Sequence, residues 1–102
     1  MFVKPMHGNR QKSYIYTLVQ KNADGRIKHA SRNTSIYAPD SENGKESILN
    51  SIKMMKRLEA ENHKMRPEDK CQYAVAVQEF GSTEKQWFNG RGQLTGEADA
   101  FS

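Results

Sequence analysis

Side chains alternate in polarity along residues 13–35, a pattern that is typical of two β-strands around the turn Asn22-Ala23-Asp24-Gly25. Asn at the first turn position, Asp at the third and Gly at the fourth favour a type I turn whose last residue adopts the left-handed conformation. This combination predicts a three-residue hairpin loop with a G1 bulge. The register it predicts pairs Val19 with His29, Leu18 with Ala30 and Tyr16 with Arg32.

This register divides the hairpin into two faces, because successive side chains of a strand point to opposite sides. One face, which we expect to meet the core, carries Ile15, Thr17, Val19 and Ile27. The other face carries Tyr14, Tyr16, Leu18, Lys28, Ala30 and Arg32. A two-residue Asp24-Gly25 turn would shift the register by one residue and move Ile27 and His29 to the tyrosine side. We favour the bulged turn because it gathers the apolar β-branched residues on one face.

A second pattern, with the period of an α-helix, follows a loop over residues 38–44 that is rich in turn formers. Apolar residues recur at helical spacing and form an amphipathic stripe: Ile48, Leu49, Ile52, Met55 and Leu58. Either Ser41 or Asn43 can serve as the N-cap, and Asn43 also begins a capping-box pattern. Because the residue before Pro67 disfavours helical geometry, we expect the helix to end within residues 62–65.

Two more strands are predicted after the helix. Residues 71–80 are nearly continuous in apolar side chains, which is typical of a strand inside a sheet, and residues 85–88 are long enough to pair back onto it. The elements predict an α+β fold with an antiparallel sheet of three to four strands (β-β-α-β and a short fourth strand) in the order 2-1-3. We expect one helix, packed on Ile15, Val19 and Ile27, so that the other face of the sheet stays open to solvent or to a partner.

Length and composition fit one domain. The chain has 102 residues, of which 35% are hydrophobic, enough for a single modest core. We expect a flexible basic arm over residues 1–12, one α+β domain over residues 13–88, and a disordered tail over residues 89–102, Gly-rich and then acidic. No apolar run approaches the roughly 18 to 20 residues that span a membrane, and the N-terminal segment lacks the features of a secretory signal. A cytoplasmic protein without membrane contact is expected.

Charge is concentrated in the hairpin half of the chain. Residues 1–37 contain seven Lys or Arg and one acid, whereas residues 71–102 contain two bases and four acids, within a net charge of +4 for the whole chain. The positive field of the first part would attract a polyanion, such as DNA or RNA, or an acidic protein surface. We expect a monomer or a homodimer.

Motifs that are typical of enzymes are missing from the sequence. It contains no phosphate-binding loop, no dinucleotide fingerprint, no nucleophile elbow and no metal-ligand spacing. The histidines are far apart, and a lone Cys71 makes neither an internal disulfide nor a zinc site. We therefore expect a non-enzymatic protein without a cofactor or metal, in which Cys71 is a small buried hydrophobe at a strand edge.

Nucleic-acid binding is the sharper functional hypothesis. Tyr14 and Tyr16 beside Lys28 and Arg32 would combine aromatic platforms for bases with positive charges for phosphates. Further phosphate contacts are expected from two helix residues, Lys53 and Arg57. A two-stranded ribbon entering a major groove is the other geometry considered. The competing interpretation is structural: the tyrosines fill a second small core under the C-terminal tail, and the bases solvate an exposed hairpin.

A second candidate site lies at Trp87-Phe88, next to the glycine-rich turn that contains Arg91. An aromatic pair beside such a turn can anchor a protein interface or stack on a base. Its structural interpretation is a strand end that closes the edge of the core. The alternative function is therefore a protein-binding inhibitor or adaptor, for example a phage or mobile-element protein that blocks a host enzyme or defence complex through an exposed strand or the Trp87 segment.

The order of the elements also resembles known domains. The strand at residues 14–18, the turn Asp24-Gly25-Arg26 and the helical stripe over residues 48–58 resemble the arm-type DNA-binding domains at the start of tyrosine integrases. The same residues resemble small β-β-α repeat domains of unassigned function. Because one fold hosts many functions, this likeness concerns the arrangement of the elements and leaves the function open.

Overall fold

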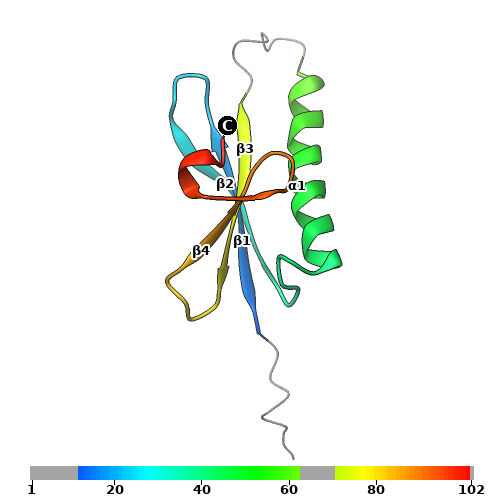
Figure 1. The fold of residues 1–102 in the computed structure, drawn as a ribbon. Coiled ribbons are helices and arrows are strands. Elements are labelled where there is room, and N and C mark those ends of the chain that lie inside the picture. The colour runs from blue at the N-terminus through cyan, green and yellow to red at the C-terminus, as the bar shows by residue number, and fades with distance from the viewer. Residues whose placement is uncertain (1–11, 63–70, 102) are drawn as a thin grey trace, which may run out of the picture.

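The elements follow the predicted order (Figure 1), in a computed structural model that describes residues 12–62 and 71–101. They are β1 (Tyr14–Lys21), β2 (Ile27–Ser35), α1 (Glu42–Ala60), β3 (Gln72–Glu79), β4 (Lys85–Phe88), β5 (Leu94–Thr95) and a short 3-10 helix (Glu97–Asp99). All strands form one antiparallel sheet in the order β2-β1-β3-β4-β5. The α+β class, the 2-1-3 order and the fourth strand are confirmed, and β5 extends the sheet.

The hairpin turn has the predicted bulged geometry. Gly25 adopts a φ of 90°, and its backbone N–H donates to the carbonyl of Asn22 over 2.9 Å. The Asn22 N–H in turn donates to the Arg26 carbonyl over 2.7 Å. Lys21 consequently lies opposite Ile27, and Val19 opposite His29, as the three-residue loop requires.

Beyond Val19 the predicted register is wrong by one residue, because β2 contains a second bulge. The register shifts between Leu18 and Val19, so that Leu18 pairs with Ser31 and not with Ala30. A bulge inserts one unpaired residue into one strand, here Ala30, and moves every later residue of that strand to the opposite face. Arg32 therefore lies opposite Thr17 and no longer shares a face with Tyr16.

The helix packs on the opposite face of the sheet from the one predicted. The buried core joins α1 to the tyrosine side of the sheet and contains Tyr16, Leu18, Ile48, Ile52, Tyr73, Val75, Val77 and Phe88. The reason lies in β3, where Val75 and Val77 pair with Leu18 and Tyr16, while the other side of β3 offers only alanines to Val19 and Thr17. Because apolar burial scales with area, the helix covers the face with the larger side chains.

The start of α1 is fixed against β1 by a close backbone approach. Ser41 is the N-cap, and its hydroxyl oxygen accepts a hydrogen bond from the Gly44 N–H over 3.0 Å. A Cβ added at Gly44 would lie 1.9 Å from the Ala38 carbonyl oxygen and 2.8 Å from the Tyr16 hydroxyl. The helix ends at Ala60, before the predicted range, most of which lies outside the described residues.

The C-terminal region differs from the expected disordered tail. The side chain of the buried Asn89 holds the turn before β5 by accepting hydrogen bonds from the backbone N–H groups of Arg91 (2.9 Å) and Gln93 (3.0 Å). Gly92 packs against Leu49 of α1, and Ala100 is fully buried. A polar residue thus organises this segment through backbone hydrogen bonds, a signal that composition does not carry. The expected arm over residues 1–12 lies, apart from Lys12, outside the described residues.

Candidate nucleic-acid interface

The side of the sheet that α1 leaves uncovered brings together two residues that the sequence placed in separate sites. Arg32 lies opposite Thr17, Thr17 opposite Ala76, and Ala76 opposite Trp87. Three strand spacings of about 4.8 Å separate the ends of this row, so Arg32 and Trp87 stand about 14 Å apart at the Cα level. Thr17 and Ala76, the two small residues between them, are buried at 9% and 4% exposure.

We call this surface the open face. Its strand positions are Ile15, Thr17, Val19, Lys21, Ile27, His29, Arg32, Thr34, Gln72, Ala74, Ala76, Gln78, Lys85, Trp87 and Thr95. Three of these residues are permanently basic, one is a histidine, and none is acidic. Among the described residues, none of the three bases forms an ion pair, whereas Arg26 in the turn pairs with Asp24 at 3.4 Å. The strand positions of the open face therefore carry a net positive charge.

A trough of about 400 Å³ is hollowed into the open face. Ile27 and His29 of β2 line one wall, Lys85 and Trp87 of β4 line the other, and Val19 forms part of the floor. The C-terminal segment over residues 97–101 borders the trough, and Figure 1 shows it crossing the strands while α1 runs along the sheet. These walls place a half-buried indole next to a cation, the combination that stacks on a base and neutralises a phosphate.

The C-terminal segment supplies the acidic and aromatic border of the trough. Glu97, Ala98 and Phe101 line it, and the Lys21 ammonium lies 5.8 Å from the centroid of the Phe101 ring. This is the geometry of a cation–π contact. The carboxylate of Glu97 faces the same cavity as the bases of the strands, so the segment brings negative charge to an otherwise basic surface.

The two predicted stacking tyrosines lie on the helix side. Tyr14 is half-buried, and Tyr16 is buried at 6% exposure, with its hydroxyl donating a hydrogen bond to the Tyr37 carbonyl oxygen. Burial, followed by the influence of Tyr14 and Asp40, raises the pKa of Tyr16 to about 12. The predicted surface of Tyr14, Tyr16, Lys28 and Arg32 is thus split: the structure leaves the tyrosines under the helix and turns Arg32 to the open face.

The remaining basic residues of the hypothesis are exposed but lie elsewhere. Lys28 pairs with Gln20 on the helix side of the sheet. Lys53 and Arg57 border a shallow depression on the outer surface of α1, together with Asn50 and Met54. None of these three cations makes an ion pair with a described carboxylate. They form no common surface with the open face, which makes them useful controls for it.

The structure also separates the residues of the predicted Trp87 segment. Trp87 is half-buried on the open face, whereas Phe88, its neighbour in β4, is part of the core. Arg91 lies in the turn before β5, where its Nε donates to the side chain of Gln93 over 3.3 Å. The structure thus leaves Trp87 as the aromatic residue that a partner can reach at this site.

Sequence reasoning missed Lys21, His29 and Lys85 as members of one surface. The available signal was the alternation of Lys85 and Trp87 along β4, combined with the small Ala74 and Ala76 on β3. That signal becomes useful only once the strand order and both registers are known. In the sequence, Lys21, His29 and Lys85 each look like an ordinary solvated base.

Cys71 joins the end of α1 to the start of β3. Its backbone N–H donates to a carboxylate oxygen of Glu59 over 2.6 Å, and its thiol donates to the side-chain carbonyl of Asn22 over 3.3 Å. Burial and the neighbouring Glu59 raise the pKa of the Cys71 thiol, so it stays protonated at neutral pH. The thiol lies at the strand edge as expected, but it is half-buried and hydrogen-bonded where a buried hydrophobe was predicted.

Within residues 12–62 and 71–101, no three His, Cys, Asp or Glu side chains cluster in a way that could hold a metal ion. No helix in this part of the chain has the length and apolar character to cross a membrane. Comparison of the chain with protein-family models, curated proteins and solved structures produced no match. Function is therefore inferred from the geometry and charge of the surface itself.

Proposed function

We propose that the chain is a non-enzymatic protein that binds single-stranded nucleic acid, DNA or RNA, on the open face of its sheet. Trp87 stacks on a base, while Arg32 and Lys85 neutralise phosphates. The observation that carries the proposal is the cross-strand row from Arg32 to Trp87, on a face whose strand positions include no carboxylate.

A single strand suits this surface better than a duplex does. The trough is bounded by side chains on two sides and has Val19 at its floor, so an aromatic wall such as Trp87 can reach only a base that is unstacked. In a duplex the base faces are covered by their neighbours, which leaves the edges and the phosphates to be contacted. The indole would then have no stacking partner.

The proposal can be tested with the protein's own fluorescence, since Trp87 is the single tryptophan of the chain. Titration with a mixed-sequence single-stranded oligonucleotide at low salt should quench the Trp87 emission. The observed affinity should fall as salt rises, with a slope of about −0.7 per neutralised phosphate. Absence of quenching and of gel retardation at low salt would overturn the proposal.

A matched pair of variants on β2 separates a specific face from general positive charge. Arg32→Ala removes a cation from the open face, and Lys28→Ala removes the same charge from the helix side of the same strand. We expect Arg32→Ala to reduce the salt slope by about 0.7 and Lys28→Ala to leave it nearly unchanged. Equal effects of the two substitutions would mean that net charge, and not the open face, attracts the nucleic acid.

A further inference from the structure

A different part of β2 is available to a different class of partner. β2 contains nine residues and stands at the edge of the sheet, and no described strand pairs with its outer side. The backbone N–H and C=O groups along that side form a template to which another extended chain can add. Seven of its nine residues are exposed, and none is buried.

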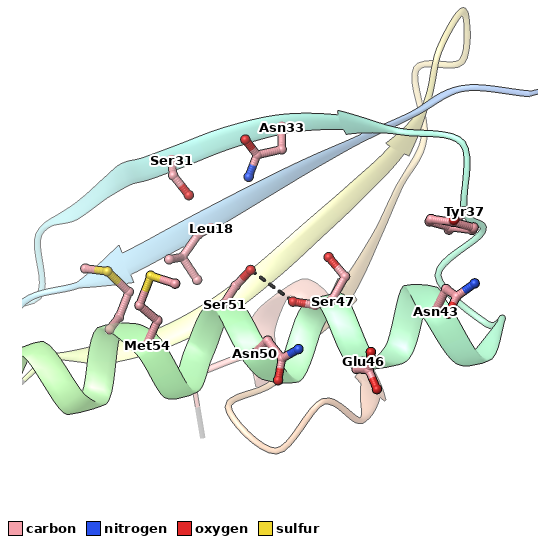
Figure 2. A pocket seen from close by; sticks show the side chains of 11 residues that line it. Leu18, Ser31, Asn33, Tyr37, Asn43, Glu46, Ser47, Asn50, Ser51 and Met54 are labelled. Atoms are coloured by element: carbon pink, nitrogen blue, oxygen red, sulfur yellow. Dashed lines mark hydrogen bonds between the residues drawn. The ribbon is translucent and has the colours of Figure 1, made fainter.

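A groove of about 600 Å³ runs directly beneath this edge strand, between β2 and α1 (Figure 2). It exists because the residues of β2 that face the helix after the bulge, Ser31 and Asn33, are too small and too polar to join the core. Leu18 and Met55 supply the apolar floor, while the helix packs under the neighbouring strands. The helix-facing side of β2 is thus left without a tightly packed neighbour.

The groove is lined by neutral groups that both donate and accept hydrogen bonds. Figure 2 shows Asn33 on β2 facing Ser47 on α1 across the groove, with the Ser51 hydroxyl bonded to the Ser47 carbonyl over 3.0 Å. The lining contains one carboxylate, Glu46, and no cation. Neutral polar or small apolar side chains suit this interior, whereas an anion would meet Glu46 without compensation.

We propose that β2 and this groove bind an extended acidic peptide segment as an additional strand. Backbone hydrogen bonds along the outer edge of β2 supply affinity, and every second side chain of the peptide enters the groove and supplies selectivity. The side chains between them point to the open face, where Arg32 favours a carboxylate opposite it. The preferred segment therefore alternates neutral and acidic residues.

The charge of β2 argues against a second copy of this chain as the occupant. Residues 27–35 contain Lys28 and Arg32 and no acid, so pairing two copies of β2 would bring like charges together. The bulge at Ala30 further restricts regular pairing to residues 31–35, the part of the strand that lies above the groove. β2 therefore favours pairing with an acidic strand and disfavours pairing with a second copy of β2.

The test uses the full chain and a dye-labelled nine-residue peptide of alternating Thr and Glu, measured by fluorescence anisotropy. Its control is a peptide of the same charge in which Pro replaces the Thr residues, because Pro cannot donate to a strand ladder. We expect the Thr-Glu peptide to bind at least ten-fold more tightly than the Pro peptide. Equal binding of the two peptides, or no binding at low salt, would overturn the proposal.

A second test of the peptide-binding proposal fills the groove with a large side chain. Ser47→Trp and Ser51→Trp each place an indole in the groove, whereas Lys53→Trp places one on the outer surface of the same helix. The first two should weaken peptide binding at least ten-fold, and the third should leave it within two-fold. Oligonucleotide binding at the open face should be unaffected by all three. Concentration-dependent dimerisation that Ser47→Trp abolishes would instead identify a second copy as the occupant and overturn the proposal.

Discussion

β1 and β2 belong to one hairpin and differ in nearly every physical respect. The middle of β1 is buried from Tyr16 to Val19, whereas β2 has no buried residue. β1 has a hydrogen-bonded strand on each edge, with α1 below it, while β2 has a partner on one edge and a groove beneath it. The difference indicates that β1 contributes most of the stability of the hairpin, and that the exposed β2 can carry charged residues and binding surfaces.

The largest expected difference in the free energy of unfolding is between substitutions of two residues that face each other across this hairpin. Leu18 on β1 is 4% exposed, and its partner Ser31 on β2 borders the groove. Leu18→Ala should lower the free energy of unfolding by about 2 to 5 kcal/mol, because it removes buried methyl groups and leaves a cavity. Ser31→Ala should change it by about 0.5 kcal/mol or less.

Urea denaturation of both variants, monitored by circular dichroism, measures the two free energies. Similar losses for Leu18→Ala and Ser31→Ala would contradict the assignment of stability to β1. A large loss for Ser31→Ala alone would show that β2 is held by contacts that its exposure does not indicate.

An intermediate effect is expected where the helix meets β1. Gly44→Ala would force a Cβ against the Ala38 carbonyl oxygen and the Tyr16 hydroxyl, and it should destabilise the fold by about 1 to 3 kcal/mol. The matched control is Gly96→Ala, because a Cβ there meets no heavy atom within 4 Å and Gly96 has a φ of −79°. Thermal unfolding of both proteins tests this, and an unchanged melting temperature for Gly44→Ala would refute the close approach.

The smallest effect concerns the hydroxyl of Tyr16. Tyr16→Phe removes its hydrogen bond to the Tyr37 carbonyl and should lower the free energy of unfolding by about 0.5 to 1.5 kcal/mol at neutral pH. Tyr37→Phe, which keeps that backbone carbonyl, serves as the control. If the two variants lose equal stability, the buried hydrogen bond is not the reason for the loss.

The same substitution has a signature at alkaline pH. The pKa of Tyr16 is raised from 10.0 to about 12, so the unfolded chain releases its proton before the folded chain does. Stability from this group is therefore complete below pH 10 and is lost as pH rises from about 10 to about 12. Tyr16→Phe should flatten the decline measured by urea denaturation across that range, although Tyr73, whose pKa is also raised, keeps part of it.

Much of the fold could be predicted because its signals are local. The turn at residues 22–25 and the N-cap, for which Ser41 was one of two candidates, each depend on a few neighbouring residues with defined conformational preferences. The strand order followed from general rules of how hairpins and crossing helices connect the strands of a sheet. The candidate site was predicted only in fragments. Arg32 and Trp87 were each selected as binding residues, but for different surfaces and in the company of residues that the structure separates from them.

The sequence by itself determined where the first four strands and the helix begin, how the hairpin turns, and that its second strand is basic. Only the tertiary structure decided which face the helix covers, because β3, far along the chain, places its valines beside Leu18 and Tyr16. The bulge at Ala30 also lies beyond local prediction, since no glycine marks it. It sets the face of Arg32, because one inserted residue reverses the direction of every side chain that follows in the strand.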